Sequence, residues 1–238
     1  MFRPLLNVSR LTGLAVAAAA AAMTWSSGAG ATTFTDPAGD FLATYAGPHN
    51  DDLDILSGSA VFNSNYLVLS STMKGAIGTT SGSSFIWGID RGSGTDRLIT
   101  SGPPAVGTPD MLLDAIVRLN ASGGGVVLTF PTAGPPLTTV LDPSLITIPG
   151  DTITGEIPRA LLPTTGFDFA DYTYVHWSRS ALGDQQFIAD LAPDAASFKA
   201  TFVPEPATWS LMIFGLGLAG GVLRFRRTAG PYRESCLG

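Results

Sequence analysis

Between residues 32 and 202 the sequence contains no long stretch with the 3.6-residue period of an amphipathic helix. Its apolar runs are short, rich in β-branched and aromatic residues, and bounded by Gly, Pro, Ser, Thr and Asn. Such runs are typical of strands, and the bounding residues are typical of turns. In the segment that begins at Tyr66, for example, Leu67 and Leu69 alternate with Val68 and Ser70, which is the period of a strand.

The spacing of these runs predicts an all-β fold, a single jelly-roll-like β-sandwich over residues 32–202. Asn63-Ser64-Asn65 is expected to form a hairpin turn, Gly123-Gly124-Gly125 to join two further strands, and Pro158–Leu162 to form a helical turn. Residues 91–110 and 131–150 are expected to be long loops. The strands are predicted over residues 54–62, 66–73, 84–90, 112–119, 126–130, 152–157, 172–179 and 185–190.

The carboxyl-terminal stretch has a different character. From Ala207 to Leu223 it carries no charge over 17 residues, which is the short end of what spans a bilayer as a helix. Trp209 lies where an interfacial aromatic belongs. We therefore predict a transmembrane helix over 207–223 and a cytoplasmic tail over 228–238. The positive-inside rule assigns the cytoplasmic end to the cluster Arg224, Arg226 and Arg227.

The residues before this helix are Pro204-Glu205-Pro206. A Pro-Glu-Pro motif, a short hydrophobic helix and an arginine-rich end together resemble a PEP-CTERM sorting signal, here over residues 203–227. The resemblance implies an exported protein of a Gram-negative bacterium and cleavage near the motif by an exosortase, a membrane transpeptidase. It also implies that the partner enzyme reads Glu205, that the arginines hold orientation, and that contact with the inner membrane is transient.

The first 31 residues have the composition of a secretory signal peptide. Arg3 and Arg10 give a positive start, an alanine-rich apolar core of about 13 residues follows, and Ala29-Gly30-Ala31 is a cleavage site of the A-x-A type. The core is too short to favour a first membrane anchor. Export through the inner membrane, followed by carboxyl-terminal processing, predicts a cell-surface or extracellular location.

The charge of the segment between the two signals excludes one class of partner. Residues 32–205 carry 18 Asp and Glu against 7 Lys and Arg, a net formal charge of −11. Nucleic-acid binding rests on clustered Lys and Arg, so no nucleic-acid partner is expected. The single cysteine, Cys236, follows the predicted membrane helix. The exported part therefore has no disulfide, thiol nucleophile or cysteine-based zinc site.

The densest group of carboxylates lies near the start of the exported segment. Calcium takes six to eight oxygen ligands, and short loops of Asp, Asn and Gly supply them. If the two loops of this region fold side by side, their carboxylates converge on one structural calcium ion. The alternative is a solvated loop whose aspartates make turn hydrogen bonds. The candidate ligands are Asp36, Asp40, Asp51, Asp52 and Asp54.

A second resemblance involves Asp51-Asp52-Leu53-Asp54-Ile55, the hairpin that follows, and the strand ending at Asp90. These features are similar to the opening of DOMON-like and carbohydrate-binding-module sandwiches, which bind sugars or haem, often with structural calcium. The axial Met and His ligands of the haem-binding members have no matching positions in this sequence, so haem is not predicted. Nor is a nucleotide, because the G-x-G-x-x-G match at Gly215–Gly220 lacks the required strand.

One strand also suggests a ligand surface. In the segment 172–177, Tyr172, Tyr174 and His176 alternate with Thr173, Val175 and Trp177, so the two sets face opposite sides. The first set could stack on the apolar face of a sugar ring. The alternative is that the same side chains pack in the core.

These patterns favour a non-catalytic protein, sorted by an exosortase and associated with extracellular polysaccharide. One alternative is an exported polysaccharide hydrolase. It requires two carboxylates in one groove, for example among Asp51, Asp52, Asp90 and Asp171. Another alternative is a purely structural matrix component without a small-molecule site. No Ser-His-Asp arrangement can be singled out, because no G-x-S-x-G motif occurs.

Overall fold

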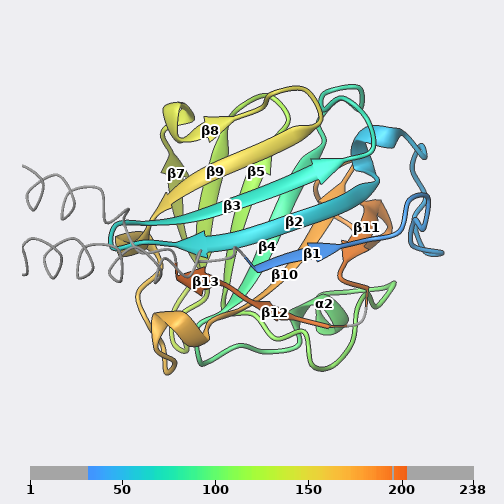
Figure 1. The fold of residues 1–238 in the computed structure, drawn as a ribbon. Helices are drawn as coiled ribbons and strands as arrows, with labels where there is room; N and C mark the ends of the chain where they lie inside the picture. The colour runs from blue at the N-terminus through green and yellow to red at the C-terminus, as the bar shows by residue number, and fades with distance from the viewer. Residues whose placement is uncertain (1–31, 195, 203–238) are drawn as a thin grey trace, which may run out of the picture. The chain divides into compact units, whose positions relative to one another are not determined.

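The computed structural model describes residues 32–194 and 196–202, which form two packed antiparallel sheets. The predicted signal peptide (1–31), membrane helix (207–223) and tail (228–238) lie outside the described residues. In the described part, no helix has the length and apolar character needed to cross a membrane. The prediction of an all-β sandwich is confirmed (Figure 1).

The first sheet has the order β1-β2-β3-β9-β8, and β13 also pairs with β2. All its pairings are antiparallel except that of β13 with β2. Its members are β1 (Thr32–Thr35), β2 (Ile55–Phe62), β3 (Tyr66–Met73), β8 (Ile146–Thr147), β9 (Thr152–Pro158) and β13 (Thr201–Phe202).

The second sheet has the order β11-β10-β4-β5-β6-β7, and β12 extends the edge beside β10. Its strands are β4 (Ser84–Asp90), β5 (Ala115–Asn120), β6 (Gly125–Thr129), β7 (Leu137–Leu141), β10 (Thr173–Arg179), β11 (Ile188–Ala192) and β12 (Phe198–Lys199). The short helices are α2 (Arg97–Thr100) and the 3-10 turns η2 (Asp51–Leu53), η3 (Pro143–Leu145), η4 (Arg159–Leu161), η5 (Phe169–Asp171) and η6 (Gln185–Phe187).

The jelly-roll part of the prediction is corrected by the strand order. In a jelly roll most consecutive strands alternate between the two sheets. Here the four strands from β4 to β7 form a meander within one sheet, and β2 and β3 form a hairpin within the other. The turns between β2 and β3 and between β5 and β6 are short, which favours pairing within a sheet over crossing to the other sheet.

The main core lies between the two sheets. On β3 every second residue is buried, including Leu67, Leu69 and Met73, as the two-residue period predicts. Trp87 and Phe85 of the second sheet pack into the same cluster. The turn predicted at Asn63-Ser64-Asn65 is present, and the Asn63 side chain accepts hydrogen bonds from two following backbone N–H groups.

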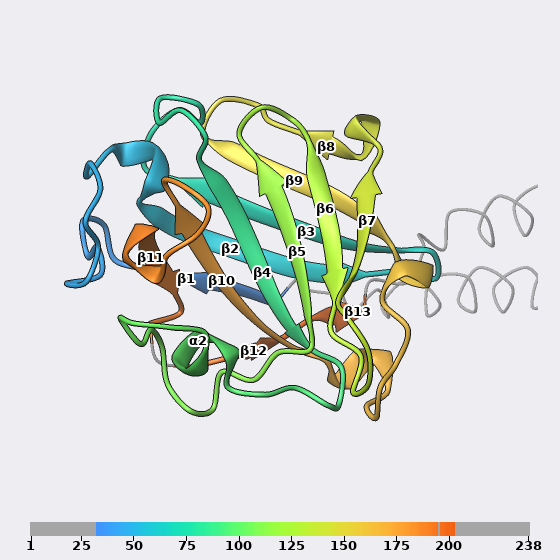
Figure 2. The same cartoon turned by 180° about the vertical axis from the view of Figure 1, so that it is seen from behind.

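A second apolar cluster lies on the outer face of the second sheet. It contains Ile86, Val175 and Trp177 from the sheet, together with Leu98 and Met111 from the segment that follows β4. Because of this cover, every residue of β4 is buried, whereas β3 alternates. Figure 2 shows this face, with α2 beside the sheet.

Two predicted loops contain regular structure. Residues 91–110 include α2, and residues 131–150 include β7, η3 and β8. The first four residues of β7 are exposed at the edge of the sheet, so their sequence carries no alternation of apolar and polar residues. The predicted strand 185–190 begins instead at Ile188, because residues 185–187 form a 3-10 turn.

The two ends of the described domain meet at one sheet edge. β1 pairs with residues 57–60 of β2, and β13 pairs with residues 61–62 of the same strand. The hydroxyl groups of Thr32 and Thr201 are in contact. The first residue after the predicted signal peptide and the strand before the predicted sorting signal are therefore neighbours.

Candidate functional site

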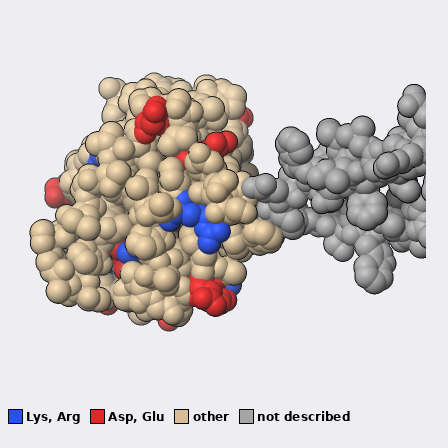
Figure 3. Space-filling view, turned by 90° about the vertical axis from the view of Figure 1, so that its left-hand side faces the viewer, with Lys and Arg blue, Asp and Glu red and all other residues tan. Residues whose placement is uncertain are grey.

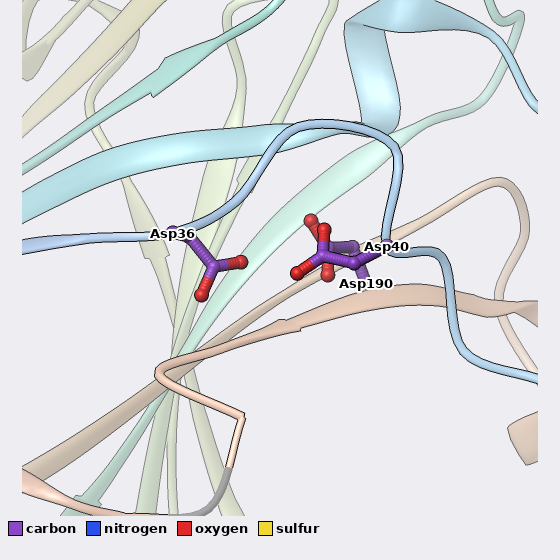
Figure 4. Close-up of side chains that lie close together, drawn as sticks. All are labelled: Asp36, Asp40 and Asp190. Atoms are coloured by element: carbon purple, nitrogen blue, oxygen red, sulfur yellow. The ribbon is translucent and has the colours of Figure 1, made fainter.

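Three aspartates converge where the first loop meets the last long strand. Asp36 and Asp40 belong to the loop after β1, and Asp190 belongs to β11. One oxygen from each carboxylate lies within 4.8 Å of the others. Figure 4 shows the three side chains directed toward one another. We call this group the carboxylate cluster.

The loop is held in place by backbone hydrogen bonds to both neighbouring strands. The Asp36 N–H donates to the carbonyl of Leu56 (2.9 Å), and the Leu42 N–H donates to the carbonyl of Ala189 (2.9 Å). Between them the chain turns at Gly39, whose φ of +84° is favourable only for glycine. The Gly39 N–H donates to both oxygens of the Asp54 carboxylate, at 2.8 and 3.0 Å.

The oxygens of the cluster are unequally satisfied. The fully buried Asp190 accepts hydrogen bonds from the N–H groups of Ile55 (2.7 Å) and Leu191 (2.8 Å). By contrast, Asp36 Oδ2 and both oxygens of Asp40 are buried and accept no hydrogen bond within the described residues. Buried acceptors without a donor are costly, so these oxygens require a proton or a cation.

The charge of the cluster is also uncompensated. Burial, followed by repulsion from Asp190 and Asp40, raises the pKa of Asp36 to about 8. Burial raises the pKa of Asp190 to about 7, partly opposed by the hydrogen bond from Ile55, and burial likewise raises the pKa of Asp40. The nearby Lys74 ammonium pairs instead with Asp51 (2.9 Å) and Asp54 (3.5 Å).

This arrangement suits a hard divalent cation. All the side-chain ligands are carboxylate oxygens, which calcium and magnesium prefer over nitrogen and sulfur donors. A bound cation would satisfy the unpaired oxygens and remove the repulsion among the three negative charges. The same oxygens are buried from solvent, so a polymer chain cannot reach them.

The structure divides the five predicted calcium ligands. Asp36 and Asp40 lie in the cluster, whereas Asp51, Asp52 and Asp54 do not. Asp51 pairs with Lys74, Asp54 holds the Gly39 turn, and the buried Asp52 accepts hydrogen bonds from the N–H and hydroxyl of Thr80, both at 2.7 Å. These three carboxylates are therefore engaged in an ion pair or in hydrogen bonds away from the cluster.

The third member, Asp190, was missed by sequence reasoning. It is more than 130 residues from Ile55, to which it is bonded, so its distance in the chain gives no indication of this contact. One signal was available. Asp190 is the only charged residue in the apolar segment Ile188–Ala192, and a charge inside a buried strand requires a partner.

The predicted sugar-stacking residues lie in the core. Tyr172, Tyr174 and His176 are fully buried between the sheets, as the predicted alternation of the strand allows, so they present no surface to a ligand. The ring of His176 stacks on Trp87 with centroids 3.8 Å apart. Its Nδ1–H donates to the carbonyl of Ile86 (2.9 Å), and Nε2 accepts from the Ser71 hydroxyl (2.8 Å). Burial lowers the pKa of His176 to about 3, so the ring is neutral.

The carboxylates named for a hydrolase are engaged elsewhere. Asp52 accepts a hydrogen bond from the N–H of Thr80. Asp90 accepts hydrogen bonds from the N–H groups of Gly92 (2.9 Å) and Gly94 (2.8 Å) in a turn. The exposed Asp171 pairs with Lys199 at 2.9 Å. On the face shown in Figure 3, acidic and basic side chains form small separate groups on a mostly uncharged surface.

The comparison with protein families finds a match over the carboxyl-terminal stretch. Residues 202–227 match the PEP-CTERM protein-sorting motif. The chain thus combines a β-sandwich with a carboxyl-terminal PEP-CTERM protein-sorting motif. This motif implies export across the inner membrane, processing by an exosortase of the membrane, and sorting to the cell surface or extracellular space. No curated protein matches the chain.

The motif begins where the sandwich ends. Phe202 is both the last residue of β13 and the first residue of the match. The described residues 32–194 and 196–202 thus reach the first residue of the sorting motif. The residues of the motif beyond Phe202 lie outside the described residues.

Proposed function

We propose that the exported domain is a non-catalytic, calcium-stabilised module that stays at the cell surface in association with extracellular polysaccharide. The observation that carries the calcium assignment is the carboxylate cluster, in which Asp36 and Asp40 have buried oxygens without a donor. Calcium at this place links the loop after β1 to β11, and so joins the amino-terminal part of the domain to its carboxyl-terminal part.

The exported location supports a role for calcium in stability. Extracellular modules bind calcium with dissociation constants on the order of 10⁻⁴–10⁻³ M, so they are filled outside the cell and not in the cytoplasm. A ligand that binds only the folded state stabilises it by mass action. The domain would therefore gain its full stability only after it has crossed the membrane.

Two observations support a non-catalytic role. The aspartates considered for hydrolysis hold turns or ion pairs, and the carboxylate cluster is closed to a polymer. Association with polysaccharide is supported by the PEP-CTERM motif, because the resemblance to such signals implies an exported protein of the kind found in bacteria that make extracellular polysaccharide. Glycan-array binding of the exported protein, with and without calcium, tests this part. A purely structural matrix component would bind no glycan.

Thermal unfolding tests the calcium assignment. The exported protein, first freed of metal with a chelator, is expected to melt at a higher temperature when calcium is added. Asp36→Asn and Asp40→Asn are expected to abolish most of that increase, because each removes a charged ligand. The matched control is Asp110→Asn at an exposed aspartate outside the cluster, which is expected to leave the increase intact. An unchanged melting temperature in calcium would refute the site.

Processing is tested separately by mass spectrometry of the surface protein. In a host with an exosortase, the intact motif is expected to yield a domain that ends near Pro204-Glu205-Pro206. Replacing Arg224, Arg226 and Arg227 together by alanine is expected to impair sorting, because the basic end fixes the orientation of the signal. Unchanged processing and location of this triple variant would contradict the role given to the arginines.

A further inference from the structure

The outer face of the second sheet contains a cavity of about 650 Å³. It lies between the sheet, the segment that begins with α2, and the residues around η6. Its apolar lining includes Ile116, Phe130 and Trp177. This volume is typical of small-molecule sites and is larger than an inorganic anion needs.

Basic side chains gather at this cavity although the domain is strongly acidic. Arg97 and Arg179 line it, and Arg118 is close enough to lower the pKa of Arg179, an effect secondary to that of burial. The ion pairs of the described residues use Lys74, Arg91 and Lys199, and none involves these three arginines. The one carboxylate that lines the cavity, on Asp184, is exposed.

Several buried polar atoms around the cavity have no partner within the described residues. They include three donors, Arg97 Nε, Arg179 Nε and Trp177 Nε1, and one acceptor, Gln185 Oε1. The groups that carry them are fixed in position. The Arg97 guanidinium stacks on the ring of Phe130, 4.1 Å from its centroid. Arg179 Nη2 donates to the carbonyls of Gly183 and Asp184, both at 2.7 Å. Gln185 Nε2 donates to the hydroxyl of Ser101 at 2.9 Å.

These requirements define the ligand. The positive charge of the guanidinium groups favours an anion, and their planar shape suits a carboxylate. The unpaired acceptor Gln185 Oε1 requires a donor, which a hydroxyl supplies, and Trp177 Nε1 requires an oxygen acceptor. The apolar lining requires a body with C–H surface. A sugar that bears a carboxylate offers all of these groups in one ring.

We infer that this cavity binds a carboxylated sugar unit of an acidic polysaccharide, with Arg97 and Arg179 holding the carboxylate and Gln185 and Trp177 contacting ring hydroxyls. The inference rests on the proposed association with polysaccharide and adds to it the site and the chemical class of the sugar. A neutral sugar would leave the guanidinium groups unpaired, so it would bind more weakly.

Calorimetric titration of the exported protein with digalacturonate, and with maltose as the uncharged probe, tests the inference. Digalacturonate is expected to bind at least tenfold more tightly than maltose and to weaken as salt is raised. Arg97→Met keeps the packing on Phe130 but removes the charge, and is expected to weaken binding at least tenfold. Trp177→Phe keeps an aromatic ring, though a smaller one, but removes the N–H donor, and is expected to weaken binding severalfold.

The matched control is Arg159→Met. Arg159 stacks on Phe169 at 4.0 Å, much as Arg97 stacks on Phe130, but it lies outside the cavity. It is expected to leave digalacturonate binding unchanged. Binding that is equal in wild type, Arg97→Met and Trp177→Phe would overturn the cavity assignment. Glycan-array binding to neutral polysaccharides alone would also overturn the cavity assignment but would leave the proposed association with polysaccharide standing. The absence of any glycan binding would contradict both the cavity assignment and that association.

Discussion

Asp114 and Asp190 are both fully buried aspartates, yet their surroundings differ in one respect. Asp114 faces a cation of the same domain, because Arg91 Nε donates to it at 2.8 Å and both side chains are buried. Ser93 and Thr165 donate further hydrogen bonds, and these with Arg91 outweigh burial and hold the pKa of Asp114 below its usual range. Asp190 faces two more carboxylates, and its pKa is raised to about 7.

Asp114 thus belongs to a buried ion pair whose charges are compensated within the domain, whereas Asp190 belongs to a cluster whose charges are not. A buried charge is tolerated when a cation and hydrogen bonds compensate it, as at Asp114. The carboxylate cluster has the burial but not the compensation, so its native form requires something that the chain does not supply. The following predictions test this distinction, from the largest expected effect to the smallest.

Removing the internal cation is expected to be the most damaging change. Arg91→Met leaves Asp114 buried without its partner and is expected to lower the free energy of unfolding by about 3–5 kcal/mol. Urea unfolding measures it. The control is Lys199→Met in the exposed pair with Asp171, which is expected to cost at most about 1 kcal/mol. Equal losses in the two variants would show that burial does not distinguish these pairs.

Supplying the external cation is expected to produce the next largest effect. Calcium at about 100 times its dissociation constant should stabilise the wild type by about 2.7 kcal/mol. Asp36→Asn should lose this gain but, in chelator, be as stable as the wild type or more so, because it removes repulsion within the cluster. Urea unfolding measures the free energy of unfolding of both proteins, each with calcium and with chelator. A variant that is less stable in chelator would contradict the repulsion.

The hydrogen bond between the uncharged side chains of Ser71 and His176 joins the two sheets, and its loss is expected to have a smaller effect. Ser71→Ala leaves Nε2 of the buried His176 without a donor and is expected to cost about 1–3 kcal/mol. Its neighbour Ser70 faces the other side of β3 and contacts the Thr154 hydroxyl at 2.9 Å, partly exposed. Ser70→Ala is the control and is expected to cost less than Ser71→Ala. Thermal or urea unfolding compares them, and the reverse order would contradict the role of His176.

The pH dependence of the metal-free protein should combine two opposing contributions. The folded-state pKa values of about 8 and 7 for Asp36 and Asp190 exceed the ordinary 3.8, so the folded state binds more protons than the unfolded state. Stability is therefore expected to fall, by on the order of 1 kcal/mol, as the pH rises from 6.5 to 8. Asp36→Asn should flatten this part of the profile in chelator.

Below pH 6.5 His176 should oppose this trend and reduce its slope. His176 has a folded-state pKa of about 3 against an ordinary 6.5, so only the unfolded state takes up this proton between those values. Its contribution to stability is therefore lost as the pH falls from 6.5 toward 3. Urea unfolding over a pH series measures both limbs. A metal-free protein whose stability rises steadily from pH 6.5 to 8 would contradict the raised pKa values of the cluster.

Local patterns predicted the strands well because each depends on near neighbours. The ranges 66–73 and 84–90 match β3 and β4, and the Asn63-Ser64-Asn65 turn is present. Prediction was poorer where burial depends on other segments. β7 has no apolar alternation because its first residues are exposed at an edge, so the sequence predicted a loop there.

The site was only half predictable for the same reason. Asp36 and Asp40 stand close together in the sequence, and this density of carboxylates predicted that they bind a cation. Asp51, Asp52 and Asp54 were equally dense but serve turns and an ion pair, a choice that only the path of the loop decides. Arg97 and Arg179, which line the cavity, are far apart in the sequence and belong to no motif.

The sequence by itself determined the destination of this protein and its class of fold. A sorting motif is read as a linear segment, and strand periodicity arises from the alternation of side chains along one strand, so neither requires distant contacts. The tertiary structure alone decided which charges are compensated. Pairing, burial and the resulting pKa values depend on which residues meet in space, and here the meeting of β11 with the first loop left three carboxylates without a cation.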